Sequence, residues 1–204
     1  MTTSDISKHL TPPERLFAIV LAAGGSSRFG STKQLAKLGG EPLVARAVRL
    51  ATEVFGERCV LVLGKDWRDV AAVCKPLRGF LVVNTEFDSG MASSIAAGTG
   101  AVAESASGIL LLLADQPLVD AAHLRLLVAR WMQNPQCIVA SEYAGIEGPP
   151  VLFPADYFDD LMALQGDHGA RTILRKPSSR VLGIRCENAG FDIDSPADLE
   201  SLSR

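Results

Sequence analysis

The sequence lacks any concentration of positive charge. Its 204 residues include 20 lysines and arginines against 23 aspartates and glutamates, so the formal net charge is −3 and the pI is near 5.6. The basic residues are scattered along the chain and form no runs. Because proteins that bind nucleic acid usually present a basic face, we expect a partner other than nucleic acid.

Long hydrophobic runs are also missing. No apolar segment approaches the roughly 20 residues that a membrane helix needs. The first residues, MTTSDISKHLTPPERL, have neither the basic start nor the apolar middle of a signal peptide. We therefore expect a cytoplasmic protein without a membrane partner.

Cysteine is scarce, and its spacing excludes two common kinds of site. The four cysteines, at positions 59, 74, 137 and 186, are far apart and form no CxxC or Cys/His pattern. A zinc site or a disulfide framework would need closer or paired spacings. We expect all four to be small buried residues in a reducing compartment.

Apolar runs and helix-period segments alternate along most of the chain. Residues 1–14 are polar and aperiodic and are expected to form a flexible N-terminal tail. From residue 15 to 204 we expect a single domain, which this length and 48% hydrophobic residues can support. Runs such as LFAIVLA, RCVLVLG and GILLLLAD are apolar throughout, as in strands buried on both faces. They predict an α/β three-layer sandwich with a mostly parallel, Rossmann-like sheet.

The second half of the chain is less regular. Residues 144–151, AGIEGPPV, are expected to be a turn-rich segment. Short helices are predicted over PADYFDDLMALQ and GARTILRK, and late strands over RVLGIRC and GFDID. This region is interpreted as an elaboration packed on the same sheet.

A glycine-rich segment, LAAGGSSRFGSTKQL, follows the first predicted strand. The loop after the first strand of a parallel sheet often cradles a phosphate. Gly24, Gly25 and Gly30 allow the backbone N–H groups to turn toward an anion, and Arg28 and Lys33 add two positive charges. The segment is neither a Walker A motif nor a GxGxxG fingerprint. Taken alone, it could also be a solvated glycine turn.

Acidic residues follow two later segments. Asp115 ends the apolar run GILLLLAD, at the edge of the sheet where the glycine loop is expected, and it is either a metal carboxylate or a turn residue. In GFDIDSPADL, period-two alternation places Asp192 and Asp194 on one face, and either could be a second metal carboxylate. Ser195 and Asp198 are explained by helix capping alone.

Together these segments resemble the molybdenum cofactor nucleotidyltransferases, a branch of the nucleotide-diphospho-sugar transferase superfamily. The glycine segment is similar to that superfamily's LAAGxSxRMGxxKxL signature, with Phe29 in place of methionine. The similarity continues through NTEFDSGMASSIAAG, LLLLADQP, GPPVLF, GDHGAR and DIDSPADL. It therefore covers nearly all of the chain from Leu16 onward. The LAAG form is typical of the cytidylyltransferase branch.

The resemblance implies a nucleotide-binding half over about residues 15–118 and an acceptor-binding half over about residues 119–204. It implies a catalytic role for Arg28, Lys33 and Asp115, and a Mg²⁺ site formed by Asp115 with Asp194 or Asp192. The implied acceptor residues are Asp167, His168 and Arg171, although Gly166 and Asp167 could simply begin a helix. The implied nucleotide-binding residues are Leu21, Ala22, Ala23, Gly24, Gly25, Arg28, Lys33, Gly64 and Ser94.

The implied reaction is transfer of CMP from CTP to the terminal phosphate of molybdopterin, with release of pyrophosphate. GTP as donor, or another small phosphorylated acceptor, is the alternative within the same fold. The sequence departs from the resemblance in the acceptor half, where it has Ile146, Glu147, Gly148 and Pro149 and many molybdopterin cytidylyltransferases have basic residues and a histidine. A different class of function is a carrier that delivers the cofactor to a molybdenum hydroxylase apoenzyme.

Overall fold

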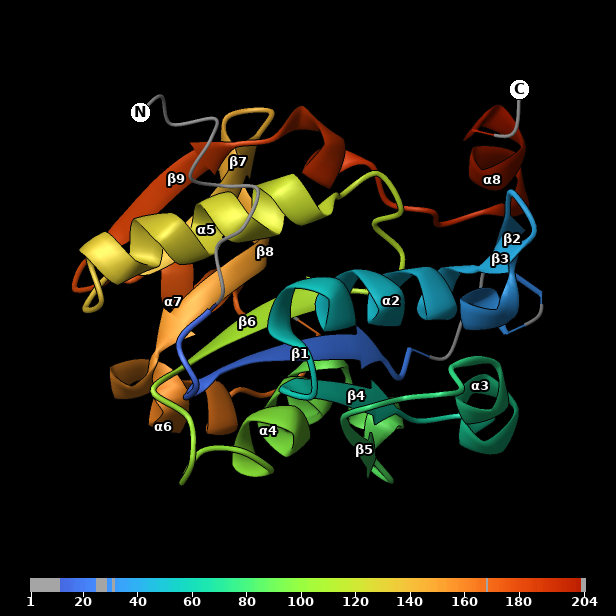
Figure 1. Cartoon of the computed structure of the whole chain (residues 1–204), viewed down its shortest axis with the longest axis horizontal. Coiled ribbons are helices and arrows are strands. Elements are labelled where there is room, and N and C mark those ends of the chain that lie inside the picture. Colours follow the sequence, from blue (N-terminus) through green and yellow to red (C-terminus); the bar gives the residue numbers. More distant parts are fainter. Residues whose placement is uncertain (1–11, 25–28, 31, 168, 203–204) are drawn as a thin grey trace.

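A seven-stranded sheet forms the centre of the protein (Figure 1). The computed structural model describes residues 12–24, 29–30, 32–167 and 169–202. Within them the strand order is β5-β4-β1-β6-β8-β7-β9. All neighbours pair in parallel except β8, which is antiparallel to both β6 and β7. The strands are β1 Leu16–Ala22, β4 Cys59–Leu63, β5 Phe80–Val83, β6 Gly108–Leu113, β7 Ile138–Tyr143, β8 Ile146–Pro154 and β9 Val181–Arg185.

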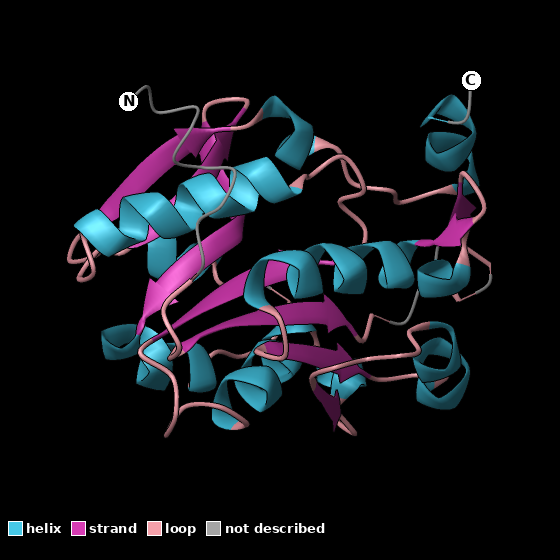
Figure 2. Cartoon of the chain, in the orientation of Figure 1, coloured by secondary structure: helices cyan, strands magenta, loops and turns pink. Residues whose placement is uncertain are grey.

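Helices cover both faces of this sheet, which confirms the predicted three-layer α/β fold (Figure 2). One face carries α2 (Leu43–Phe55), α3 (Trp67–Val73) and α5 (Ala121–Gln133). The other carries α4 (Met91–Gly100), α6 (Phe158–Met162) and α7 (Arg171–Leu174). The shorter elements are the 3-10 helices η1 Lys33–Leu35, η2 Phe87–Ser89, η3 Ala155–Tyr157 and η4 Glu187–Gly190, the hairpin strands β2 Lys37–Leu38 and β3 Glu41–Pro42, and helix α8 Pro196–Leu202.

The apolar character of β1 follows from its central place. Every residue of β1 is buried. Because side chains alternate along a strand, Ala18 and Val20 pack in the α2 and α5 layer, whereas Ile19 and Leu21 pack in the α4 and α6 layer. A strand with a core on each side therefore has no polar face.

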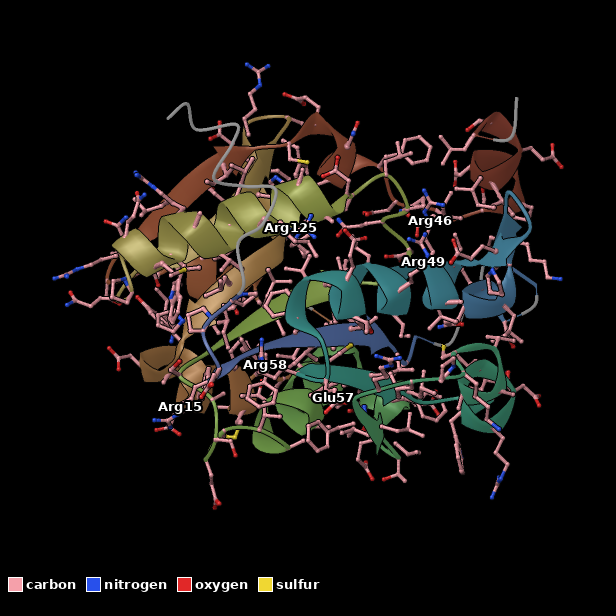
Figure 3. All side chains as sticks on the ribbon, in the orientation of Figure 1. Arg15, Arg46, Arg49, Glu57, Arg58 and Arg125 are labelled. Carbon is pink, nitrogen blue, oxygen red and sulfur yellow. The ribbon has the colours of Figure 1, made fainter. Side chains whose placement is uncertain are left out.

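Two arginines tie the helices of one layer to their surroundings (Figure 3). Arg46 of α2 donates from Nε to the backbone oxygen of Pro117, at 3.0 Å, in the loop that follows β6. Arg125 of α5 forms an ion pair with Glu53 of α2, with an N–O distance of 3.0 Å. The first contact holds α2 near the end of β6, where the candidate site lies, and the second joins α2 to α5.

The structure corrects the prediction for residues 144–151. Only Ala144 and Gly145 turn, with φ angles of 49° and 74°, and positive φ at both positions suits a tight hairpin. The following residues form β8, paired on both sides. Pro149 and Pro150 fall where the register between β7 and β8 shifts, and their lack of an N–H group is tolerated at such irregularities.

The prediction of a strand over GFDID is wrong. Residues 191–195 belong to no ladder in the described structure. A backbone hydrogen bond of 2.9 Å runs from Ile193 N–H to the oxygen of Asp115. The expected alternation survives, because Ile193 is buried while Asp192 and Asp194 are exposed. Ile193 is therefore buried between the two exposed aspartates although this segment does not pair with a strand of the sheet.

The predicted tail and the two predicted halves stay predictions, and residues 1–11 lie outside the described residues. Among the residues that the structure describes, no helix is long and apolar enough to cross a bilayer.

Candidate active site

A cleft of about 450 Å³ opens at the carboxyl ends of β1 and β6. Ligands of open α/β sheets bind at this edge. The cleft brings together eight of the residues predicted from the sequence: Leu21, Ala22, Ala23, Gly24, Lys33, Ser94, Asp115 and Asp167. It also contains residues that were not predicted: Gln34, Leu43, Phe87, Asp88, Gly90, Met91, Leu113 and Ala114.

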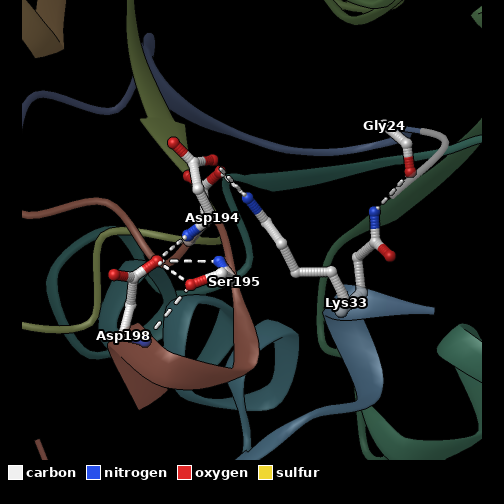
Figure 4. Close-up of polar contacts among 7 residues, drawn as sticks. Gly24, Lys33, Asp194, Ser195 and Asp198 are labelled. Carbon is white, nitrogen blue, oxygen red and sulfur yellow. Dashed lines mark hydrogen bonds and ion pairs between the residues drawn. The ribbon is translucent and has the colours of Figure 1, made fainter. Parts of the chain in front are cut away.

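The described part of the glycine loop is held by a buried glutamine. Gln34 is only 7% exposed, and its Nε2 donates to the backbone oxygen of Gly24 at 2.8 Å (Figure 4). The start of the loop is thereby fixed to η1, which also carries Lys33. Gly25 and Arg28 lie outside the described residues, so their roles stay predictions.

Lys33 joins the three segments that the sequence singled out (Figure 4). Its Nζ donates to Asp115 Oδ2 at 2.7 Å and to Asp194 Oδ1 at 3.2 Å. Burial by itself would lower the pKa of Lys33, but the charge of Asp115 and the hydrogen bonds to both carboxylates raise it overall. Lys33 is therefore a cation at neutral pH, placed at the rim of the cleft.

Asp194 is held next to Lys33 by the start of α8. Asp198 Oδ2 accepts hydrogen bonds from the backbone N–H of Asp194 at 3.0 Å and from the backbone N–H of Ser195 at 2.7 Å (Figure 4). The Ser195 hydroxyl also donates to Asp198 Oδ2, at 2.8 Å. This is a capping box, as the sequence predicts. It stabilises the backbone on which Asp194 stands.

The carboxylates at this rim carry more negative charge than Lys33 balances. Asp115 Oδ1 is buried and has no hydrogen-bond partner among the described residues. Although Asp192 is exposed to solvent as a residue, desolvation of its carboxyl group, followed by repulsion from Asp115 and Asp194, raises the pKa of Asp192 to about 6. The described residues contain no group of three or more His, Cys, Asp or Glu placed to hold a metal. A cation here would need additional ligands from a bound substrate.

Ser94 and Gly64 lie in different settings. Ser94 stands in the first turns of α4 and lines the cleft. Gly64 lies at the end of β4, where an added Cβ would come within 2.6 Å of Phe87 Cβ and 2.7 Å of the Ala23 backbone oxygen. The close packing of Phe87 thus accounts for glycine at position 64, while its predicted nucleotide contact remains untested.

The structure separates the predicted acceptor residues. Asp167 lies in the cleft, and its loop is held to α4 by a hydrogen bond of 3.1 Å from Ala92 N–H to the oxygen of Gly166. Arg171 instead lines a small pocket of about 80 Å³ with Ile146 and Glu147. His168 lies outside the described residues.

One buried residue with a place in the site was missed. Asn84 directly follows β5 and is 5% exposed. Its Nδ2 donates to Ser94 Oγ at 3.0 Å. The signal that marked Asp115, a polar residue directly after an apolar strand, could also have identified Asn84.

Residues 18–181 match the model of the MobA-like NTP transferase domain. The chain belongs to this family. The match covers the glycine loop, Lys33 and Asp115, whereas Asp192 and Asp194 lie beyond its last residue.

Three proteins illustrate the similarity. The chain is 29% identical over 200 residues to the purine catabolism protein PucB of Bacillus subtilis (strain 168), covering 93% of this chain and 96% of the relative. It is 32% identical over 198 residues to nicotine blue oxidoreductase of Paenarthrobacter nicotinovorans, covering 90% and 94%. A solved structure, Rv0371C of Mycobacterium tuberculosis H37Rv in complex with manganese, is 27% identical, covers 92% of this chain and 97% of that one, and has a TM-score of 0.76.

Proposed function

We propose that this protein is a Mg²⁺-dependent nucleotidyltransferase that transfers CMP from CTP to the terminal phosphate of molybdopterin, with release of pyrophosphate. The observation that carries the proposal is the arrangement of Lys33, Asp115 and Asp194 at the mouth of the cleft, beside the glycine loop. A triphosphate bound there would meet the half-buried Lys33 cation and carboxylates suited to a metal. The family is one of NTP transferases, which supports the class of reaction.

The residues present fit a divalent cation. Asp115 supplies a buried carboxylate oxygen without a partner among the described residues, and Asp194 or Asp192 would supply a second carboxylate. Mg²⁺ is commonly held by one or two carboxylates plus substrate phosphates, which agrees with the small ligand set. When bound, the cation would neutralise charge on the phosphates. The manganese in the Rv0371C structure supports a divalent metal in this protein also.

The chemistry that remains for the protein is positioning and charge neutralisation. An oxygen of the acceptor phosphate attacks the α-phosphorus, a new P–O bond forms, and the bond to the β-phosphate breaks so that pyrophosphate leaves. The acceptor phosphate already carries the attacking charge, so no protein nucleophile is required. Lys33 is expected to stabilise the added charge on the phosphates, and Asp115 keeps its amine charged and in place.

The nucleotide and the acceptor are assigned from the resemblance of the sequence motifs. Asp167, which reaches the same cleft as the nucleotide residues, is proposed to contact the acceptor there. Arg171 lies near the buried Tyr143 hydroxyl, where its charge partly offsets the burial that raises the pKa of Tyr143. Its pocket is a second, more distant place for an anionic group.

Pyrophosphate release by the purified protein tests the proposal. The assay compares CTP with GTP, each with Mg²⁺ and with or without molybdopterin. Release that requires both CTP and molybdopterin is expected. Asp115→Asn should lower the rate about 100-fold or more, in the range seen when charge-stabilising groups are removed. Asp160→Asn is the matched control, because Asp160 pairs with Lys176 on the surface and not in the cleft.

Other outcomes separate the alternatives. Pyrophosphate release with GTP but not with CTP would place the protein with the guanylyltransferases. CTP binding without release for any pterin would contradict the molybdopterin assignment and favour another phosphorylated acceptor, or a carrier that hands the cofactor to a molybdenum hydroxylase apoenzyme. A full rate in Asp115→Asn would contradict the proposed metal site.

A further inference from the structure

Asn84 forms a small buried network at the end of β5. Its side-chain Nδ2 donates to Ser93 Oγ at 2.9 Å and to Ser94 Oγ at 3.0 Å. Its Oδ1 accepts the backbone N–H of Glu86 at 2.9 Å. The residue therefore connects the end of an edge strand to the first turns of α4.

The orientation of this amide is determined by its partners. The backbone N–H of Glu86 can only donate, so the atom that faces it must be the amide oxygen. The amide nitrogen consequently faces the two serines. Both hydroxyl oxygens act as acceptors for Asn84, and each hydroxyl proton must point elsewhere.

The two serines differ in where that proton goes. Ser93 Oγ donates to the backbone oxygen of Gly90 at 2.8 Å or to that of Glu86 at 2.9 Å, so its proton is used within the protein. For Ser94 the described residues provide no acceptor. Ser94 is 5% exposed and lines the cleft. Its hydroxyl is thus presented to the cleft as a hydrogen-bond donor.

We propose that Asn84 is a positioning residue that holds the Ser94 hydroxyl as a donor toward the cleft, so that this part of the site selects a nucleotide base presenting a hydrogen-bond acceptor. A carbonyl oxygen or an unprotonated ring nitrogen accepts the Ser94 proton, whereas an exocyclic amine placed there meets only the second lone pair of the hydroxyl and leaves its proton without an acceptor among the described residues. The inference rests on the proposed nucleotidyltransferase function. It adds that the base-binding part of the site donates a hydrogen bond to the base.

Asn84→Asp tests the direction of the hydrogen bond between residue 84 and Ser94, because the two side chains have nearly the same size and shape. The carboxylate still accepts the Glu86 N–H, but it can no longer donate to Ser94, whose hydroxyl will then turn and donate to it. The readout is the ratio of two dissociation constants measured by calorimetry with Mg²⁺, one for CTP and one for inorganic tripolyphosphate. Tripolyphosphate has no base, so it reports any repulsion between the new charge and the phosphates.

We expect Asn84→Asp to weaken CTP binding relative to tripolyphosphate by roughly three- to tenfold, the range for one neutral hydrogen bond. Ser94→Ala should give a similar change in the ratio, and the double variant should show no further loss, because both substitutions remove the same donor. Ser93→Ala is the matched control. It removes the other hydroxyl that accepts a hydrogen bond from Asn84. Because Ser93 does not line the cleft, the ratio should stay unchanged.

An unchanged ratio in Asn84→Asp would overturn the inference, as would losses that add in the double variant. If the wild-type protein releases pyrophosphate from CTP but the ratio does not move, only the role of Asn84 fails. If the wild-type protein binds tripolyphosphate, and binds no nucleoside triphosphate more tightly than tripolyphosphate, the proposed function and this inference fail together.

Discussion

Replacing Gly98 by alanine tests how closely α4, which carries Ser94, is packed on the sheet. A Cβ at position 98 would lie 2.7 Å from Ile19 Cγ2 and 2.9 Å from Val62 Cγ2. Both distances are well inside van der Waals contact. Ile19 and Val62 stand on the central strands β1 and β4 and are fully buried, and their β-branched side chains have few alternative rotamers. The helix or the strands must therefore move.

The magnitude follows from two opposing effects. Overpacking of a core typically costs about 1–3 kcal/mol, whereas the higher helix propensity of alanine returns up to about 1 kcal/mol. We expect Gly98→Ala to lower the free energy of unfolding by about 1–2 kcal/mol. Gly100 is the matched control on the same helix, because its added Cβ would meet only Met162 Sδ, at 3.9 Å. Gly100→Ala should be neutral or stabilising by up to about 1 kcal/mol.

Urea denaturation of the two variants provides the measurement. The expected difference between them is about 1–3 kcal/mol, which corresponds to roughly 2–12 °C in melting temperature for a chain of this size. CTP binding measured in parallel should weaken for Gly98→Ala alone, because the shift displaces Ser94. Equal stabilities for the two variants would refute the close packing of α4 against β1 and β4.

Two further predictions concern stability. Burial lowers the pKa of His123 from 6.5 to about 4, so the unfolded chain binds the extra proton and the free energy of unfolding should fall as the pH decreases through this window, by about 3 kcal/mol in total. Urea titrations between pH 7 and pH 4 should show that the free energy of unfolding of His123→Gln no longer has this dependence on pH. The same decrease in wild type and variant would contradict the assignment to His123. Ser195→Ala removes the hydroxyl that caps α8 through its two hydrogen bonds with Asp198 and should lower the free energy of unfolding by about 1 kcal/mol in the same measurement. A loss that falls within experimental error would mean that the cap does not stabilise the fold.

The central sheet could be predicted from the sequence because its signal is local. LFAIVLA and GILLLLAD are short runs that are apolar on both faces, and the alternation with longer helix-period segments favours strands covered on both sides. The glycine loop and Asp115 follow these strands directly. Since parallel strands end at the same edge, their proximity could also be expected.

Local patterns were misleading where pairing partners lie far away in the chain. Two prolines and two glycines between residues 144 and 151 indicate a turn, yet β8 forms there because it pairs with β6 on one side and β7 on the other. Hydrogen bonds from Gln116 to the oxygen of Pro149, at 3.2 Å, and from Ser141 to the oxygen of Pro150, at 2.8 Å, help to satisfy the irregular part of β8. Neither donor is adjacent in the sequence.

The sequence by itself determined the layered fold, the glycine loop and the rim on which Asp115 stands, because each depends on periodicity or on the order of strand and loop. The tertiary structure decided that Lys33 joins Asp115 to Asp194, that Asn84 donates a hydrogen bond to Ser94, and that Arg171 and Asp167 line different pockets. The Asn84–Ser94 and Lys33–Asp194 hydrogen bonds connect residues 10 and 161 positions apart. They depend on how the strand ends and the loops approach one another in space, which no local pattern records.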